Sequence, residues 1–537
     1  MKKNSTKQQA VQRHKQGALE AAKLLYEQYL DGHPDDDDAL HALGVLLAQQ
    51  SQFSFAEEKI NAALQKNPKQ ITYLNSLGNV YRHLKRYDDA VRCYRQAIKI
   101  NSRYAIAHNN LGNVFYRQKK MHAAEQAYQK AISLQPNYHD AIINLSVLAD
   151  WYLCNDDYAK ASRIFLQCFA LLPDATDYLF RAGIAFFKQN NLTEAKIHFE
   201  NVLMRDHHYP EANQYLAHTL LGLQAFDQAI HYYYRQLEQQ PFFETYYNLG
   251  VLYQMKGRFK EGLSYFQQAL LQQPNDTNTL QNMGQIYLKQ NQLNDALRCY
   301  EIVLQKDPEN IEARYVAAAL RQENIPAQAP NTFISNLFDQ YAAYYDQHLT
   351  KQLEYNVPEK LHQSLLLEYP NIQPNAWKII DLGCGTGLCG KYFKPLAHTL
   401  IGIDLSEKML ETAKQTQCYD QLIKDDIETG LAGMADSDCI IAADVFSYIG
   451  DLSALFNTAK QALKKGGVFL FTVEKMITSD ANPLFFQLTP ALRYTHHQSY
   501  LAALIQEHGF ELLRMEKISL RKQRGKWVEG YSVFLRV

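Results

Sequence analysis

The sequence lacks the long apolar runs and the net charge that mark several classes of protein. In its 537 residues, no uncharged apolar run approaches the roughly 18 residues that a membrane-spanning helix needs. The formal net charge is -1 at pH 7, so the whole chain offers no electrostatic basis for binding nucleic acid or an anionic membrane. With 47% hydrophobic and 21% charged residues, the composition is typical of a folded soluble protein, and the length favours two or more domains.

Cysteine is sparse and unpaired in the sequence. The eight cysteines are scattered, no C-x-x-C pair occurs, and the closest two, Cys384 and Cys389, belong to one glycine-rich stretch. Disulfides and a zinc site are therefore not expected, and a reducing cytoplasm fits best. The first sixteen residues are basic, but no apolar segment follows them, so they do not predict a signal peptide.

A period of 34 residues runs through the first three hundred residues. It is clearest in the segments 76–102 and 110–136, where four kinds of position agree: Gly78 with Gly112, Ala90 with Ala124, Tyr94 with Tyr128, and Ala97 with Ala131. Small residues let two helices approach closely, the aromatic fills the gap beside them, and a proline ends the second helix. The pattern resembles the tetratricopeptide repeat. We expect an all-α superhelix over 1–323, with about eight full repeats over 37–310 and part-repeats at either end.

The repeat frame also predicts a binding groove and one helix start. Two residues before the repeat glycine, four units carry asparagine: Asn110, Asn144, Asn248 and Asn282. An amide both donates to and accepts from a peptide backbone, so this row predicts a groove for an extended protein or peptide chain. It resembles the asparagine ladder of O-linked N-acetylglucosamine transferase; the alternative is a merely solvated helix face. The acidic run 35–38 favours a helix start over a metal site.

A second domain is expected after a proline-containing linker at 324–332. From 333 to 537, short apolar runs such as "KIID", "TLIGID" and "DCIIAA" alternate with helical segments. This alternation predicts an α/β, Rossmann-like domain with a central, mostly parallel sheet. The late segments "FELLRM" and "YSVFLRV" are expected to add edge strands, which would give seven strands in all.

The stretch "IIDLGCGTGLCGKYF" places a glycine loop after the first strand of this domain. Its notable residues are Asp381, Gly383, Cys384, Gly385 and Gly387. A dinucleotide fingerprint needs a third glycine at 388, where leucine stands, and a P-loop needs a hydroxyl at 392, where tyrosine stands. A carboxylate before the glycines suits a ligand that carries positive charge and no phosphate. These features favour S-adenosylmethionine over NAD or a nucleotide phosphate.

Three further acids follow the next three strands. Asp404 ends "TLIGID", in a position to accept both ribose hydroxyls, and Leu405 follows it. Asp426 and Ile427 come after the third strand and are expected beside an adenine. Asp444 follows the fourth strand and is expected to face the crevice at the carboxyl ends of the strands.

The glycine loop and the ordered acids resemble the class I S-adenosylmethionine-dependent methyltransferases, and with the repeats the chain resembles bacterial methyltransferases that carry tetratricopeptide repeats. The resemblance implies cofactor contacts from the glycine loop and from the residues that follow the next three strands. It also implies that Asp381 orients the amino group of the cofactor through water, and that Tyr345 closes over the methionine end; a core position for Tyr345 is the alternative.

The chemistry of the acceptor is not encoded in the site. Methyl transfer needs a base only when the acceptor must lose a proton, and His496, His497, Tyr494 and Asp444 are the candidates, the alternative for the two histidines being a polar surface. The catalytic set expected is His496, Asp444 and Tyr345.

No N-P-P-Y sequence follows the fourth strand, which argues against amide and adenine N-methylation. A repeat-based adaptor with a cofactor-sensing or inactive second domain remains an alternative, and an NAD-dependent oxidoreductase a weaker one.

Overall fold

The structure is a computed structural model that describes residues 3–342, 346, 349, 353–477, 485–523 and 525–537. The chain divides into two compact units, residues 1–245 and 246–537. The boundary expected at 324–332 stays a prediction, because that segment lies inside the second unit. In the described part of the chain, no helix is long and apolar enough to cross a membrane.

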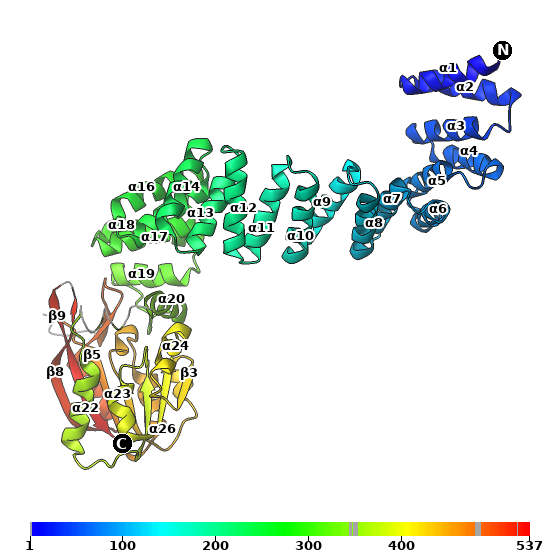
Figure 1. Cartoon of the computed structure of the whole chain (residues 1–537). Helices are drawn as coiled ribbons and strands as arrows, with labels where there is room; N and C mark the ends of the chain where they lie inside the picture. The colour runs from blue at the N-terminus through cyan, green and yellow to red at the C-terminus, as the bar shows by residue number, and fades with distance from the viewer. Residues whose placement is uncertain (1–2, 343–345, 347–348, 350–352, 478–484, 524) are drawn as a thin grey trace. The chain divides into compact units, whose positions relative to one another are not determined.

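Helices in pairs make up the repeat region (Figure 1). The eight expected repeats correspond to the pairs from α3–α4 to α17–α18, and the part-repeat at the front is the pair α1–α2. The bounds are α1 Lys3–Lys15, α2 Leu19–Gly32, α3 Asp37–Gln49, α4 Phe53–Lys66, α5 Ile71–His83, α6 Tyr87–Ile100, α7 Ala105–Arg117, α8 Met121–Leu134, α9 His139–Cys154, α10 Tyr158–Leu171, α11 Thr176–Lys188, α12 Leu192–Arg205, α13 Ala212–Gly222, α14 Phe226–Gln239, α15 Phe243–Met255, α16 Phe259–Gln272, α17 Thr277–Lys289, α18 Leu293–Lys306 and α19 Ile311–Arg321.

The close approach expected between the two helices of a repeat is confirmed. A Cβ added to Gly112 would lie 2.5 Å from the Tyr128 ring, and one added to Gly78 would lie 2.5 Å from the Tyr94 ring. Both rings are almost fully buried. The glycine therefore makes room for the aromatic, which is the physical reason for the period. The helix start expected in the acidic run is also confirmed, because the Asp36 carboxylate caps α3 by accepting from the amide of Ala39 at 2.9 Å.

A seven-stranded sheet forms the centre of the second unit, in the order β3-β2-β1-β4-β5-β9-β8. The first five of these strands run parallel, and β9 runs antiparallel to both β5 and β8. The bounds are β1 Trp377–Leu382, β2 Ala397–Asp404, β3 Gln421–Lys424, β4 Ser437–Ala442, β5 Leu463–Glu474, β8 Glu511–Gln523 and β9 Lys526–Arg536. Only one of the two late segments, in β8, lies at an edge, because β9 is inserted between β5 and β8.

Short helices surround this sheet, and a small two-stranded hairpin that the sequence did not predict lies beside it. The hairpin is β6 Phe486–Leu488 with β7 Tyr494–His496. The helix after the glycine loop begins at Gly390, two residues later than expected. The helices are α20 Asn331–Tyr341, α22 Val357–Glu368, α23 Gly390–Phe393, η3 Lys394–Leu396, α24 Glu407–Gln415, α25 Ile427–Leu431, η4 Phe446–Tyr448, α26 Ser453–Ala462 and α27 Gln498–Glu507.

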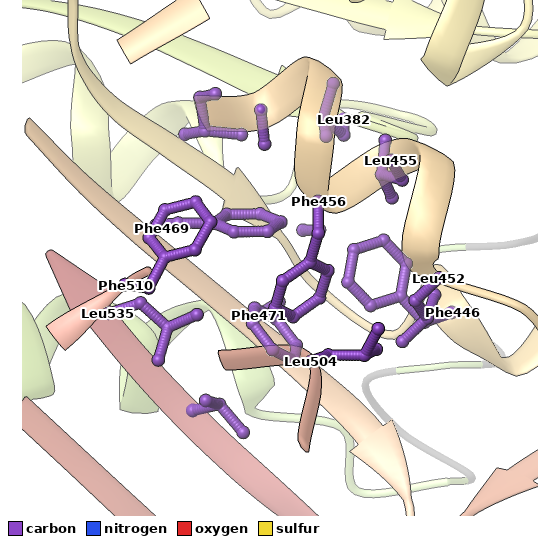
Figure 2. Close-up of a cluster of buried hydrophobic side chains, with 14 of the residues drawn as sticks. Leu382, Phe446, Leu452, Leu455, Phe456, Phe469, Phe471, Leu504, Phe510 and Leu535 are labelled. Atoms are coloured by element: carbon purple, nitrogen blue, oxygen red, sulfur yellow. The ribbon is translucent and has the colours of Figure 1, made fainter. Parts of the chain in front are cut away.

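The largest apolar core of this unit lies on one face of the sheet, under α26 and α27. Figure 2 shows the rings of Phe446, Phe456, Phe469 and Phe471 gathered there. The Phe469 and Phe471 rings come from β5, with centroids 4.8 Å apart, and Phe456 on α26 packs edge-on against both. Burying large aromatic rings is among the strongest contributions to stability, so this core holds the strand ends in a fixed relation.

Within the second unit, the end of the repeat array is packed on the sheet domain. The Tyr315 hydroxyl, on α19, donates to the carbonyl of Leu492 at 3.0 Å, in the loop of the β6–β7 hairpin. The Tyr494 hydroxyl in turn donates to the carbonyl of Pro326 at 2.8 Å. Ala327 and Ala329 pair with the backbone around Tyr448, so the expected linker forms backbone hydrogen bonds with the domain that follows it.

Candidate active site

A cavity lies at the carboxyl ends of the parallel strands, where the order changes from β1 to β4. This is the position at which open α/β sheets bind ligands, because the connections from neighbouring strands diverge there. Six of the residues predicted to hold a cofactor line it: Gly383, Gly385, Asp404, Leu405, Asp426 and Ile427. Asp444, predicted for both cofactor and catalysis, lines it as well. The strand-end acids are thus brought together as the sequence indicates.

The glycine loop borders this cavity with two residues in left-handed backbone. Gly385 has φ +54, and a Cβ added there would meet no heavy atom within 4 Å, so the loop is open on that side. Gly383 has φ +61, and a Cβ there would lie 2.6 Å from Val445. Glycine is required at both positions, by backbone conformation and, at Gly383, by the close approach of the loop after β4.

The Asp404 carboxylate fixes the loop to the end of β2. It accepts from the amide of Gly385 at 2.9 Å and from the amide of Ser406 at 2.8 Å. Burial raises the pKa of Asp404, and these two backbone bonds oppose that rise. A carboxylate held in this way at the wall of a cavity can accept further hydrogen bonds from hydroxyl groups, since two oxygens offer about four acceptor positions.

Asp426 is positioned as the N-cap of α25. Its carboxylate accepts from the amide of Glu428 at 3.0 Å, and Ile427 is the first residue of the helix. The apolar Ile427 side chain is buried, and Leu405 lines the same cavity. A planar, apolar ring with polar edges fits between such residues, which is the chemistry expected for adenine.

Three residues predicted for the cofactor do not line the cavity in the structure: Asp381, Cys384 and Gly387. Asp381 is 1% exposed, and its carboxylate accepts from the Tyr419 hydroxyl at 2.6 Å. Burial raises the pKa of Asp381 to about 7, although the bond from Tyr419 opposes the shift. Its assignment to the amino group of a cofactor stays a prediction.

One wall of this cavity was not predicted from the sequence, and its residues precede the sheet in the chain. It consists of residues from the expected linker and from α20: Gln328, Ala329, Asn331, Ile334 and Phe338. A further bond joins α20 to the strand ends, since the Ser406 hydroxyl donates to Asp339 at 2.5 Å. In the sequence, Phe338 and Tyr341 are apolar residues at helical spacing, but nothing local distinguishes a helix that lines a cavity from one that covers a core.

Asp444 stands in strained backbone at the end of β4, with φ 62. Its amide donates to the Thr472 hydroxyl at 2.9 Å, and its carboxylate accepts from Nη1 of Arg521 at 2.6 and 2.5 Å. Arg521 also donates to Glu474 from its other terminal nitrogen. Left-handed non-glycine residues concentrate at functional sites because the surroundings must hold them. Here an arginine and a threonine do so.

A second cavity adjoins the first. Phe338, Asp444 and Tyr448 line both, so these three residues form the common wall. Its other lining residues include Leu337 on α20, Leu349 and Leu353 between α20 and α22, Leu492 and Arg493 in the hairpin loop, and Arg521 and Lys522 at the end of β8. A reacting group beside Asp444 would therefore be accessible from both sides.

Of the four predicted bases, Asp444 lines both cavities, whereas His496, His497 and Tyr494 line neither. His496 is fully buried rather than on a polar surface, and its Nε2 lies 3.0 Å from the Gly450 carbonyl. Burial lowers the pKa of His496 to about 4. His497 caps α27, with Nδ1 accepting from the amide of Ser499. Tyr345 lies outside the described residues. A catalytic role for His496 or Tyr345 stays a prediction.

The asparagines predicted for a groove are half-buried, and three of them donate to a side chain of the preceding repeat. Nδ2 of Asn110 donates to Asn75 at 2.9 Å, and Nδ2 of Asn144 donates to Asn109 at 2.9 Å. Nδ2 of Asn282 donates to the Tyr247 hydroxyl at 3.2 Å. Asn248 also has a partner within the chain. An amide has two N–H donors and one acceptor oxygen, so one such bond orients the group without exhausting it.

Comparison with known families agrees with both parts of the chain. Residues 380–471 match a methyltransferase domain family. Tetratricopeptide repeat families match residues 13–71, 78–119, 103–174 and 242–308. The chain therefore carries tetratricopeptide repeats followed by a methyltransferase domain.

Curated proteins that the chain is similar to include three methyltransferases. The chain is 29% identical over 139 residues to the mitochondrial ubiquinone biosynthesis O-methyltransferase of Homo sapiens, covering 24% of this chain and 38% of that protein. It is 27% identical over 157 residues to the malonyl-[acyl-carrier protein] O-methyltransferase of Erwinia pyrifoliae, covering 29% of this chain and 57% of that protein. It is 35% identical over 117 residues to the 18S rRNA (guanine(1575)-N(7))-methyltransferase of Saccharomyces cerevisiae, covering 19% and 42%. The chain thus spans between 38% and 57% of the lengths of these three relatives.

Solved structures resemble one part or the other. A tetratricopeptide repeat protein from Parabacteroides merdae is 17% identical with a TM-score of 0.30, covering 48% of this chain and 98% of that one. An S-adenosylmethionine-dependent methyltransferase from Mesorhizobium loti is 21% identical with a TM-score of 0.27, covering 33% of this chain and 98% of that one.

Proposed function

We propose that this chain, in which tetratricopeptide repeats precede a methyltransferase domain, is a class I S-adenosylmethionine-dependent methyltransferase whose repeats recruit a protein or peptide partner. The observation that carries the cofactor assignment is the Asp404 carboxylate, held by the amides of Gly385 and Ser406 at the wall of the first cavity. The methyl acceptor is a separate question.

The residues around the first cavity fit this cofactor. Two carboxylates, Asp404 and Asp426, border it beside an open glycine position, and the apolar Leu405 and Ile427 line it as well. Carboxylates accept from ribose hydroxyls and favour a cationic ligand, whereas they repel phosphates. When bound, the cofactor supplies an electrophilic methyl group on a positively charged sulfur.

The chain orients the reactants and excludes water from the site. The backbone of the glycine loop and Asp404 fix one side, and Phe338 and Ile334 on α20 close the other. Alignment of reactants and exclusion of water supply much of the acceleration in a displacement of this kind. Asp444 lies at the common wall with the second cavity, where the acceptor would be placed.

Calorimetric titration of the full chain with S-adenosylmethionine and S-adenosylhomocysteine tests the assignment. We expect micromolar binding that Asp404→Ala weakens by about tenfold or more, as for the loss of charged hydrogen bonds. Glu407→Ala is the control, because Glu407 is an exposed acid on α24 that pairs with Lys424 and does not line the cavity. A folded chain that binds neither ligand would sink the proposal.

Transfer of a labelled methyl group into a cell lysate separates an enzyme from an adaptor. Label in protein that decreases in the Asn110→Ala/Asn144→Ala double variant would support recruitment through the repeats. Cofactor binding without any transfer of label would favour the adaptor with a cofactor-sensing domain. The double variant should bind the cofactor as the parent does, since both asparagines belong to the residues 1–245 unit.

A further inference from the structure

The second cavity holds two arginines whose surroundings differ. Arg521 is almost completely buried, with its side chain 3% exposed, and it bridges Asp444 and Glu474. One cation thus faces two carboxylates at hydrogen-bond distance. Because a buried charge is costly unless it is paired and hydrogen-bonded, Arg521 is explained by these two partners alone.

Arg493 lies beside this cluster but is held loosely. Its Nη1 lies 3.4 Å from Glu474 and 3.3 Å from the Ser447 hydroxyl, both longer than the contacts that Arg521 makes with Asp444. Its Cζ is 5.2 Å from the centre of the Tyr448 ring, which supports the guanidinium from one side. The side chain is 25% exposed and lines the second cavity.

Among the residues that the structure describes, Arg493 has fewer hydrogen-bond partners than it has donors. A guanidinium offers five N–H groups in a planar fork that matches a carboxylate or a phosphate, and the contacts to Glu474 and Ser447 both use one nitrogen. Glu474 is shared with Arg521. A cation held on a ring, with a weak and shared counter-charge, is arranged to receive an anion from the cavity.

The rest of the second cavity is largely apolar. Its apolar lining includes Phe333 and Leu337 on α20, together with Leu349, Leu353 and Leu492. Lys522 also lines it, but its ammonium pairs with Glu354 at 2.5 Å. Over the described residues that line it, the cavity therefore combines one available cation with a hydrophobic wall, which suits a molecule with an anionic end and an apolar body.

We propose that the second cavity binds the methyl acceptor as an amphipathic anion, with its carboxylate or phosphate on Arg493 and its apolar part against α20. This inference rests on the proposed function only in calling the ligand the acceptor. The cavity shares Phe338, Asp444 and Tyr448 with the cofactor cavity, so an anion on Arg493 would be close to the place of transfer.

Calorimetric titration of the full chain with octanoate, octyl phosphate and octanamide tests the proposal without any turnover. We expect octanoate or octyl phosphate to bind at least about tenfold more tightly than the neutral octanamide, and Arg493→Gln to remove that preference. Arg493→Lys keeps the charge but loses the fork and should retain part of it. The better of the two anions identifies the anionic group.

Controls separate this proposal from the previous one. Lys522→Gln should change octanoate binding by less than about threefold, because Lys522 already pairs with an exposed glutamate. Binding of S-adenosylhomocysteine by Arg493→Gln should match the parent, which also reports that the variant is folded. Equal binding of octanoate and octanamide, or an unchanged preference in a folded Arg493→Gln chain, would overturn the anion site. A parent chain that binds octanoate but not S-adenosylhomocysteine would instead refute the cofactor assignment and leave the anion site standing.

Discussion

The amide of Gly385 donates to the Asp404 carboxylate across 2.9 Å, which joins the loop after β1 to the end of β2. The two residues are 19 positions apart in sequence, and the bond holds the open side of the loop toward the cavity. The affinity for a ligand in this cavity therefore depends on a backbone conformation as well as on side chains.

Gly385→Ala should weaken binding of S-adenosylhomocysteine by about tenfold or more. Alanine is strained at φ +54, and its methyl group would project into the open space beside the loop. Gly433→Ala is the matched control, because Gly433 has φ +81 and open surroundings but does not line the cavity. Calorimetry on both variants decides the point, and equal affinities would show that the loop is not in contact with the ligand.

Arg521→Met should lower the free energy of unfolding of the second unit by about 3 kcal/mol, because it leaves Asp444 and Glu474 buried without their cation. Urea unfolding followed by the fluorescence of Trp377 and Trp527 measures this. Adding Glu474→Gln to Arg521→Met should restore part of the loss. A single variant as stable as the parent would mean that the two carboxylates find water or another cation.

Loss of the proton from Asp381 should make the second unit less stable as pH rises from about 4 to about 7. Its pKa is about 7 in the folded chain against the usual 3.8, so the folded state binds the extra proton in this range and the unfolded state does not. The full effect is at most about 4 kcal/mol. Asp381→Asn can still accept from Tyr419 and should flatten the profile, as urea unfolding at pH 5 and pH 7.5 would reveal. An unchanged slope would assign the titration to another group.

His496→Gln should lower stability and leave the affinity for the cofactor unchanged. The pKa of His496 is about 4, below its usual 6.5, so its stabilising effect is complete above pH 6.5 and is lost as pH falls toward 4. The variant should lose this acid sensitivity. Thermal unfolding at pH 5 and pH 7.5, with calorimetry beside it, gives the readout. A folded variant that binds cofactor but transfers no methyl group would instead support a catalytic histidine.

Gly112→Ala should destabilise its own repeat by about 1–2 kcal/mol, since the added methyl group would lie 2.5 Å from the Tyr128 ring. Amide hydrogen exchange in α7 and α8 should accelerate by about tenfold. Gly32→Ala is the control, because Gly32 ends α2 with no heavy atom within 4 Å of an added Cβ. Equal exchange in both variants would show that the repeat absorbs the methyl group by a small helix shift.

The sequence predicted the repeats and the strand-end acids because each has a local cause. The period of 34 follows from the contact between Gly112 and Tyr128, which recurs in every unit that keeps the pair. Asp404 and Asp444 reach one cavity because parallel strands end at one edge of the sheet. The fold class, the seven strands and half of the cavity wall follow from such rules.

The rest depends on tertiary packing and has no local signal. Arg521 lies in a basic stretch of β8 that reads as an exposed edge strand, yet it is buried against Asp444. Ala329 lies in a proline-containing segment typical of a linker, yet it is fully buried at the cavity. Their positions follow from which elements meet in space, and a single sequence does not encode that in any one window.

The contacts of the segment from Tyr315 to Asn331 determine where another repeat array can be joined to the methyltransferase domain. This segment holds the hairpin loop at Leu492, pairs with the backbone at Tyr448 and supplies part of the cofactor cavity wall. A crossover that exchanges one repeat array for another would leave the methyltransferase intact only if it fell before α19. A chimera that keeps the methyltransferase domain folded should therefore retain α19, whatever repeat array precedes it.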